Sequence, residues 1–533
     1  MDQTATYLPY ESTGYFSKIV SDYLSQPDSL QPFYLHTPDL PGLQRSIAAR
    51  KIFPTQRKVL VEVLQEQYAG LTLTDITKTN IESLLQEQVF TVTTAHQPNI
   101  FTGPLYLIYK IIHTIKLADE LTAAIPDAKF VPVYYMGSED ADLDELGYVN
   151  VGGQKLVWET KQTGAVGRMK VDKVLIRLIH AIHGQVGVLP FGQELTDLLL
   201  RCYTEGKSIQ QATLELVNAL FGSFGLVVLV PDHAKLKSIF QPVVQKELLE
   251  GFSHSIVADT IEKIGRHYKV QAGGRDINLF YLVDDKRERI EWLDQRYEVK
   301  ALGLSFSKEE ILKELSEHPE RFSANVILRG AFQETVLPNI AFIGGGGELA
   351  YWLELKNVFE AVQIPYPVLI LRNSFLLLKK EQWLKWQKLG FTEADLFTAE
   401  LDLLNILVKR ETEHQVTINE ELQQAQLLYK QLRGITDKVD STLSEHVTAL
   451  EKQALKKLTA LEKKLLRAER LKYDVQRQQI HTLTQQLFPN NSLQERVDNF
   501  SLHYATYGNN WLQMIYEVST GLNKGFGIIT SRD

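Results

Sequence analysis

The chain has 533 residues, 44% apolar and 23% charged, and is long enough for about three or four domains of an ordinary globular protein. Its 57 Lys and Arg residues are outnumbered by 65 Asp and Glu residues, and the net charge of -8 argues against a protein that holds nucleic acid through phosphates. The single cysteine, Cys202, excludes an intramolecular disulfide and a cysteine-based zinc cluster.

The first ten residues have neither the basic segment nor the apolar segment of a signal peptide. The longest apolar runs, such as 226–230 and 367–371, have the length of strands and fall short of the ~20 residues that cross a bilayer. Together with the lone cysteine, this pattern indicates a protein of the reducing cytoplasm that does not enter a membrane.

Two stretches read as strand, polar or glycine-rich loop, helix and strand. In the first, a strand at 89–95 precedes the loop 96–103, a helix from Pro104 to about Leu121, and a strand at 130–136. The second has a strand at 339–343, four glycines, a helix at 348–360 and a strand at 367–372. A weaker unit surrounds 226–230. Apolar strands that alternate with helices predict an α/β fold with a parallel sheet covered on both faces.

From about Thr392 the pattern changes to apolar residues at spacings of three and four, along 418–439 and again along 443–468. These runs predict two long antiparallel coiled-coil helices with their tip near 434–441. We therefore expect three regions: a core at 1–390 with inserted segments at about 150–225 and 235–330, a coiled-coil hairpin at 391–490, and C-terminal helices at 491–533 that pack back on the core.

His96 and Asn99 lie where a parallel strand ends and a helix begins, which is where ligands bind in open α/β sheets. Helix N-termini attract phosphate, and we expect Thr102 and Gly103 to contribute to such an anion site. The alternative, about equally weighted, is a His–Asn pair that only satisfies the loop backbone.

The acidic segment 139–145 follows the next strand. Its carboxylates could bind Mg²⁺ through water or hold an ammonium group, and Glu139, Asp140 and Asp142 are the better candidates because they are nearest the strand end. A solvated acidic loop is the alternative, slightly favoured for the segment as a whole.

The four glycines between strand and helix form a potential anion nest, although close packing of strand and helix would also require glycine. Arg372, at the end of the next strand, suits a phosphate or carboxylate, and Arg168 and Arg275 are looser candidates. The predicted substrate-binding and anion-binding sets also include Asn373 and Ser374, and Gly344, Gly345, Gly346 and Gly347 respectively.

These segments together resemble the BshC family, the cysteine ligases of bacillithiol biosynthesis. The resemblance rests on 94–106 (TAHQPNIFTGPLY), 130–142, 164–168, 275–280, 343–352, 371–375 and the coiled-coil segment 461–469. It implies a Rossmann-like core similar to nucleotidyltransferases, with insertions and a coiled-coil arm. Two positions depart from the family pattern: Ala141 stands where a His is usual, and Gly346 where a Pro is usual.

The resemblance also implies a reaction, the joining of L-cysteine to glucosaminyl malate, which we expect to require ATP with Mg²⁺ to activate the cysteine carboxylate. His96 and Asn99 would then be catalytic, and no protein-bound metal site is expected. Two alternatives stay open: a scaffold protein that uses its coiled coil, and a nucleotidyltransferase acting on another small acid. Antiparallel arms often pair, so we also expect a homodimer through the coiled coil.

Overall fold

The computed structural model describes residues 3–522 and 524–531. The chain forms two compact units: one contains 7–376 and 492–527, and the other contains 377–491 with the two chain ends. The divisions near the ends and at 376 fall inside strands β1 (Gln3–Pro9), β15 (Phe375–Leu378) and β16 (Gly525–Ser531).

The larger unit is built on a five-stranded sheet in the order β14-β13-β2-β3-β6. Its strands are β2 (Val89–His96), β3 (Lys129–Met136), β6 (Val227–Leu229), β13 (Asn339–Gly344) and β14 (Val368–Leu371). Every pairing is parallel, and β2 and β3 pair over eight residues each, from Val89 opposite Lys129 to His96 opposite Met136. The predicted α/β fold with a parallel sheet is confirmed.

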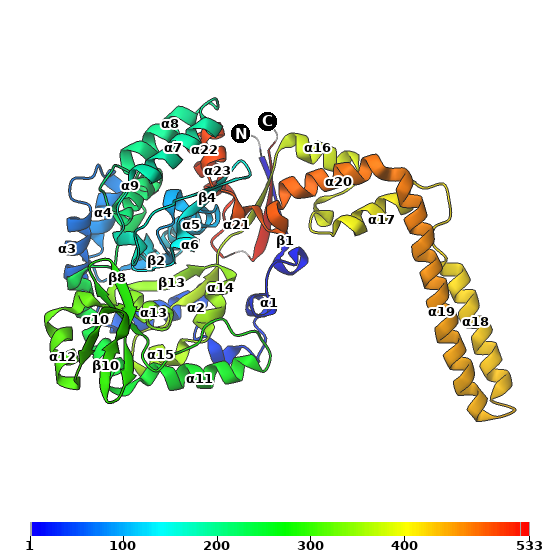
Figure 1. Cartoon of the computed structure of the whole chain (residues 1–533), viewed down its shortest axis with the longest axis horizontal. Helices are drawn as coiled ribbons and strands as arrows, with labels where there is room; N and C mark the ends of the chain where they lie inside the picture. Colours follow the sequence, from blue (N-terminus) through cyan, green and yellow to red (C-terminus); the bar gives the residue numbers. More distant parts are fainter. Residues whose placement is uncertain (1–2, 523, 532–533) are drawn as a thin grey trace. The chain divides into compact units, whose positions relative to one another are not determined.

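Helix α5 (Tyr106–Ala124) connects β2 to β3 and packs on both strands. Figure 1 shows α5 close to β2 in the blue and cyan part of this unit. Apolar side chains of α5 and α2 (Leu40–Ile52) join those of the sheet in one buried cluster, which includes Phe90, Leu117 and Ile340. This core fixes the strand ends from which the polar loops emerge.

The helix predicted as one element at 348–360 is two helices, α14 (Gly346–Leu353) and α15 (Lys356–Ala361). At the break, the Trp352 carbonyl accepts hydrogen bonds from the Leu355 amide at 2.9 Å and from the Tyr366 hydroxyl at 2.7 Å. The neighbouring Glu354 carboxylate accepts the amides of Gln271 and Ala272. The bonds from Tyr366, Gln271 and Ala272 come from distant parts of the chain and hold the bend. Local periodicity therefore could not predict it.

The remaining elements of this unit precede the sheet, fill its two long insertions, or follow them. Before the sheet lie α1 (Lys18–Ser25), α3 (Arg57–Gln67) and α4 (Asp75–Ser83). Between β3 and β6 lie α6 (Leu143–Leu146), β4 (Tyr148–Val151), β5 (Gln154–Val157), α7 (Lys173–Val186), α8 (Gly192–Cys202) and α9 (Ile209–Phe221). Between β6 and β13 lie α10 (Ala234–Glu250), α11 (Phe252–Gly265), β7 (Leu279–Val283), β8 (Lys286–Arg289), β9 (Glu291–Leu293), β10 (Arg296–Val299), β11 (Leu304–Phe306), α12 (Lys308–Glu317), β12 (Phe322–Ala324) and α13 (Val326–Val336). Near the C-terminus lie α21 (Gln494–Val497), α22 (Ser501–Tyr507) and α23 (Asn509–Val518).

The smaller unit is helical. It contains α16 (Lys380–Lys388), α17 (Glu400–Glu411), α18 (Asn419–Thr436), α19 (Ser441–Arg470) and α20 (Asp474–Leu487). Helices α18 and α19 pack side by side as a hairpin, as Figure 1 shows. Their turn lies at 437–440, where Asp440 caps α19 by accepting the Thr442 amide. The predicted pair of long coiled-coil helices is confirmed. Within the described residues, no helix combines the length and apolar character needed to cross a membrane.

Candidate active site

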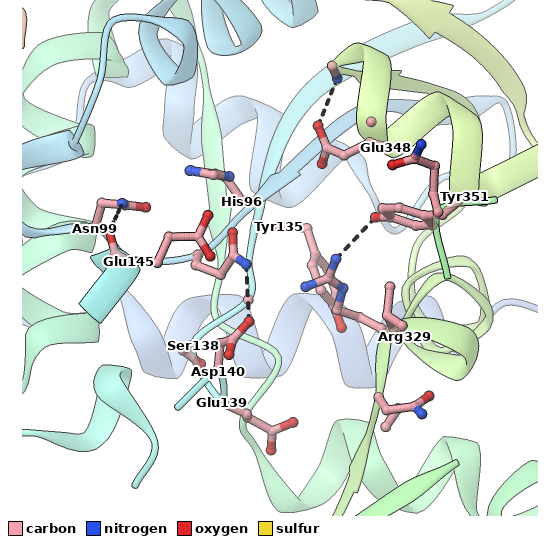
Figure 2. A pocket seen from close by; sticks show the side chains of 18 of the residues that line it. His96, Asn99, Tyr135, Ser138, Glu139, Asp140, Glu145, Arg329, Glu348 and Tyr351 are labelled. Atoms are coloured by element: carbon pink, nitrogen blue, oxygen red, sulfur yellow. Dashed lines mark hydrogen bonds between the residues drawn. The ribbon is translucent and has the colours of Figure 1, made fainter. Parts of the chain in front are cut away.

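A cavity of about 1130 Å³ opens at the carboxyl ends of the parallel strands. Its walls include the ends of β2, β3 and β14 and the glycine-rich segment after β13, the edge at which ligands bind in open α/β sheets. Figure 2 shows His96, Asp140, Glu145, Arg329 and Glu348 around this space. Loops distant in sequence therefore meet at one polar cavity.

His96 is the last residue of β2, and its ring stacks edge-on against Tyr106 at 5.1 Å between centroids. Its Nε2 is buried and makes no hydrogen bond within the described structure. Burial first, and then the positive charges of Lys110, Arg329 and Arg372, hold the pKa of His96 well below its usual value. The imidazole is consequently neutral at neutral pH and has a ring nitrogen free for a ligand.

Asn99 follows His96 by three residues and is buried. Its Nδ2 donates to the Glu145 carbonyl at 3.4 Å, whereas its Oδ1 has no partner among the described residues. Gly103 has φ +62°, and a Cβ there would come within 2.7 Å of the Asn99 Cβ. Glycine is required because a side chain would collide with Asn99.

Thr102 and Gly103 were predicted to bind an anion, but the structure places neither on the cavity wall. Helix α5 begins at Tyr106 rather than Pro104, after a 3-10 turn at Ile100–Thr102. Asn499 holds this turn by donating to the carbonyls of Phe101 and Gly103. The turn packs against Asn99 without lining the cavity.

The glycines divide into two kinds. Gly344 ends β13 away from the cavity wall, and a Cβ there would lie 2.9 Å from side-chain atoms of Leu349 and Phe342, so close packing explains this glycine. Gly345, Gly346 and Gly347 line the cavity at the start of α14.

The start of α14 already has an internal anion. The Gly345 amide donates at 2.8 Å to the carboxylate of Glu348, which also forms an ion pair with buried Lys110 at 2.5 Å. A bound anion would thus share this helix start with Glu348.

The predicted carboxylates have different partners. Glu139 lines the cavity but forms an ion pair with buried Lys237 and accepts the Ser323 hydroxyl at 3.0 Å. Asp140 lines the cavity and accepts from the Gln97 side chain at 3.0 Å. Asp142 instead caps α6 by accepting the Glu145 amide, and it lies off the cavity wall.

Arg168 is not in the main cavity. It makes a bidentate ion pair with Asp232, at 2.6 and 2.7 Å, and lines a separate pocket of about 470 Å³. The structure therefore separates Arg168 from His96.

Arg372 reaches the main cavity, but its charge is matched. Its two terminal nitrogens donate to Glu495 at 2.9 and 2.7 Å, and both side chains are at most 6% exposed. Asn373 and Ser374 lie off the wall: the Asn373 amide donates to His113, and the Ser374 hydroxyl accepts from Arg372. This group ties β14 to the C-terminal segment.

Sequence reasoning missed the guanidinium groups that remain available. Arg329 donates to the Tyr351 hydroxyl at 3.1 Å, Arg287 donates to Ser323 and to the Ala324 carbonyl, and Arg496 donates to the Tyr15 carbonyl. All three line the cavity, together with Arg275, which was only a loose candidate. The hydrogen-bond acceptors of Arg329, Arg287 and Arg496 are neutral oxygens, and none of the three forms an ion pair among the described residues. These guanidinium groups can therefore bind an anionic ligand.

A signal for some of these residues was present in the sequence. Lys110 and Arg329 are single charges within apolar helical runs, at 106–112 and 326–332. A charge is expensive to bury without a purpose, so such positions mark a site or an internal ion pair.

Comparison with known proteins agrees with this architecture. The model of the BshC N-terminal Rossmann-like domain of bacillithiol biosynthesis matches residues 3–373, and that of the BshC C-terminal coiled-coil domain matches 375–531. A protein of Flavobacterium johnsoniae named "Putative cysteine ligase BshC" is 39% identical over 98% of this chain and 99% of its own length. Proteins of the same name from Cytophaga hutchinsonii and Bacillus cytotoxicus are 39% and 26% identical, over 91% and 95% of this chain and 91% and 96% of their own lengths. On matches that span nearly all of its length, the chain belongs to the BshC family of bacillithiol biosynthesis.

Proposed function

We propose that this protein is a ligase that joins the carboxylate of L-cysteine to the amine of glucosaminyl malate, giving bacillithiol, and that ATP activates the carboxylate. The observation that carries the proposal is the cavity itself. In a member of this family it gathers, at the ligand-binding edge of the sheet, the His96 Nε2, which has no partner among the described residues, the Asn99 amide and several guanidinium groups.

Amide formation in water requires an activated acyl group, because a free carboxylate is a poor electrophile. Activation transfers a phosphoryl or adenylyl group to the cysteine carboxylate, and negative charge shifts on the phosphate oxygens as it proceeds. The Asn99 Nδ2 has a second N–H besides the one that donates to the Glu145 carbonyl, and neutral His96 can carry an Nε2–H. Both can donate hydrogen bonds to this charge, and such donors are where enzymes gain most electrostatic stabilisation.

The guanidinium groups of Arg329 and Arg287 suit the anionic parts of the two substrates, namely the nucleotide phosphates and the two carboxylates of malate. Holding both substrates in one cavity can itself lower the barrier by roughly 7–11 kcal/mol. Among the described residues no group of three or more His, Cys, Asp or Glu is arranged to hold a metal, and we propose that Mg²⁺ arrives with the nucleotide phosphates.

The test is to incubate purified protein with ATP, L-cysteine and glucosaminyl malate and to measure bacillithiol by mass spectrometry. Release of pyrophosphate would identify an acyl adenylate, and release of phosphate an acyl phosphate. Product formation at an unchanged rate without ATP would overturn the activation scheme.

We also propose that the protein acts in the cytoplasm as a homodimer paired through the hairpin of α18 and α19. Several apolar side chains of the hairpin remain exposed, including Leu427 at 59% and Ile435 at 61%. Exposed apolar rows on a coiled coil are commonly covered by another helix. Sedimentation that shows only the 60.8 kDa species would reject the dimer.

A further inference from the structure

We propose that Glu145 is the general base of the ligation step, the group that takes a proton from the attacking amine. This assignment rests on the function proposed above, since it concerns the second half of that reaction. It arises from the distribution of partners among the cavity carboxylates, of which Glu145 has the fewest.

Among the residues that the structure describes, four carboxylates line the cavity: Glu139, Asp140, Glu145 and Glu348. Glu139 is neutralised by Lys237, and Glu348 is neutralised by Lys110 and also accepts the Gly345 amide. Asp140 accepts from Gln97 and interacts with the charge of Arg329. Each of these three is committed to a cation or to a hydrogen-bond donor of the protein.

Glu145 differs because its backbone is held by hydrogen bonds while its carboxylate has no hydrogen-bond or ion-pair partner among the described residues. Its amide donates to the Asp142 carboxylate at 3.1 Å and its carbonyl accepts from Asn99 at 3.4 Å, so the backbone is anchored to the loops after β3 and β2. Figure 2 shows Glu145 in the part of the cavity bounded by His96 and Asn99. A carboxylate on a fixed backbone can meet an amine at a defined position.

The surroundings of Glu145 favour proton uptake. Partial burial, and then the negative charges of Asp142 and Asp140, raise the pKa of Glu145 above its usual value. The polar and charged groups on the neighbouring elements are His96 and Asn99 after β2, Tyr106 of α5, Asp140 and Asp142 of its own loop, and Tyr148 of β4. His96 is a weaker base here because its pKa is well below its usual value.

The proposed step is balanced in atoms and charge. The amine nitrogen of glucosaminyl malate forms a bond to the cysteine acyl carbon, and the bond from that carbon to the phosphate oxygen breaks, leaving its electron pair on the departing phosphate. The proton lost by the nitrogen passes to a Glu145 carboxylate oxygen and then to solvent. A general base typically contributes 10²–10⁴-fold to such a step.

The experiment compares Glu145→Gln with Asp144→Asn, a matched amide change at the exposed neighbouring position. Each full-length variant is assayed with ATP and cysteine in two reactions, one with glucosaminyl malate and one with hydroxylamine, which is neutral at pH 7 and attacks activated acyl groups without a base. We expect Glu145→Gln to lose on the order of 10²-fold or more in kcat with glucosaminyl malate. Its rate of hydroxamate formation should stay within a few-fold of that of Asp144→Asn. Its kcat for ligation should no longer fall at acidic pH, where the Glu145 carboxylate of the unchanged protein becomes protonated. Formate added to Glu145→Ala should restore part of the ligation.

Full ligation by Glu145→Gln would overturn the assignment. So would loss of hydroxamate formation in that variant when its thermal unfolding matches that of Asp144→Asn, because Glu145 would then act in activation. If the unchanged protein forms neither product, the ligase proposal fails, and this assignment fails with it.

Discussion

Lys110 of helix α5 and Glu348 of helix α14 both line the cavity and form an ion pair of 2.5 Å. Lys110 also donates to the Ala95 carbonyl at 2.7 Å, and Glu348 also accepts the Gly345 amide. The pair joins the two helices that follow the neighbouring strands β2 and β13. It therefore sets the distance between His96 and the glycine segment.

We expect Glu348→Gln to destabilise the protein by roughly 3–5 kcal/mol, because it leaves buried Lys110 charged without its anion. Urea denaturation of Glu348→Gln measures this effect. The same measurement on Lys110→Met, on Glu348→Leu and on the double variant Lys110→Met, Glu348→Leu tests whether the two residues are coupled. The double variant should be more stable than either single variant. Equal and additive losses would mean that the pair is not coupled.

The sheet and the hairpin were predictable because their signals are local. The strand at Val89–His96 is rich in β-branched residues, and the apolar spacings of α18 and α19 continue over many turns. The break between α14 and α15 was not predictable, because its cause is a hydrogen bond from Tyr366.

The candidate site was predictable only in part for the same reason. The positions of His96 and Asn99 follow from where a strand ends. The ion pair of Arg372 with Glu495 joins residues 123 positions apart. The ion pair of Glu139 with Lys237 also joins residues that are far apart in the sequence. No residue spacing reports such partners, so sequence reasoning counted these charges as available for a ligand.

Two glycine replacements should have opposite effects on stability. Gly103→Ala places a Cβ at φ +62° and 2.7 Å from Asn99, so we expect a loss of at least about 1–2 kcal/mol together with lower activity. Gly347→Ala, in helix α14 with nothing within 4 Å of its Cβ, should be neutral or stabilising by up to about 1 kcal/mol. Thermal unfolding distinguishes them, and equal shifts would contradict the close approach at Asn99.

Asp498 should make stability depend on pH. Burial raises the pKa of its carboxyl from 3.8 to about 6 in the folded protein, so the folded state binds this proton more tightly than the unfolded state. The folded state consequently loses stability as the pH rises from about 4 to 6, and the loss is complete above the folded pKa.

Asp498→Asn should remove that loss. We expect the variant to be about 1–3 kcal/mol more stable than the parent at pH 7, and the difference should vanish below pH 4. Urea titrations at a series of pH values measure it. Asp276→Asn, at an 87% exposed position, is the control and should show no such trend. A constant difference at all pH values would reject the pKa argument.

Replacement of His96 by Ala should lower ligation by on the order of 10²-fold or more. The cost in stability should stay near about 0.5–1.5 kcal/mol, because the variant loses the ring contact with Tyr106 but its Nε2 has no partner to lose within the described structure. Activity with saturating substrates, beside a urea denaturation curve, separates the two effects. Full activity would remove His96 from the reaction, and unfolding of the variant at low urea would assign it a structural role.

Arg329 and Arg372 should respond differently to loss of charge, although both line the cavity. Arg329→Met removes a guanidinium that donates to the neutral Tyr351 hydroxyl and forms no ion pair among the described residues, so we expect binding of an anionic substrate to weaken about 10–100-fold with little change in stability. Arg372→Met leaves buried Glu495 unpaired and should cost roughly 3–5 kcal/mol in stability. Calorimetric titration with ATP and with malate, beside urea denaturation of each variant, tests both statements. Arg266→Gln, at a position 64% exposed, is the control for loss of a positive charge. If Arg329→Met binds both ligands as tightly as this control, the cavity arginine does not hold the substrate's anionic group.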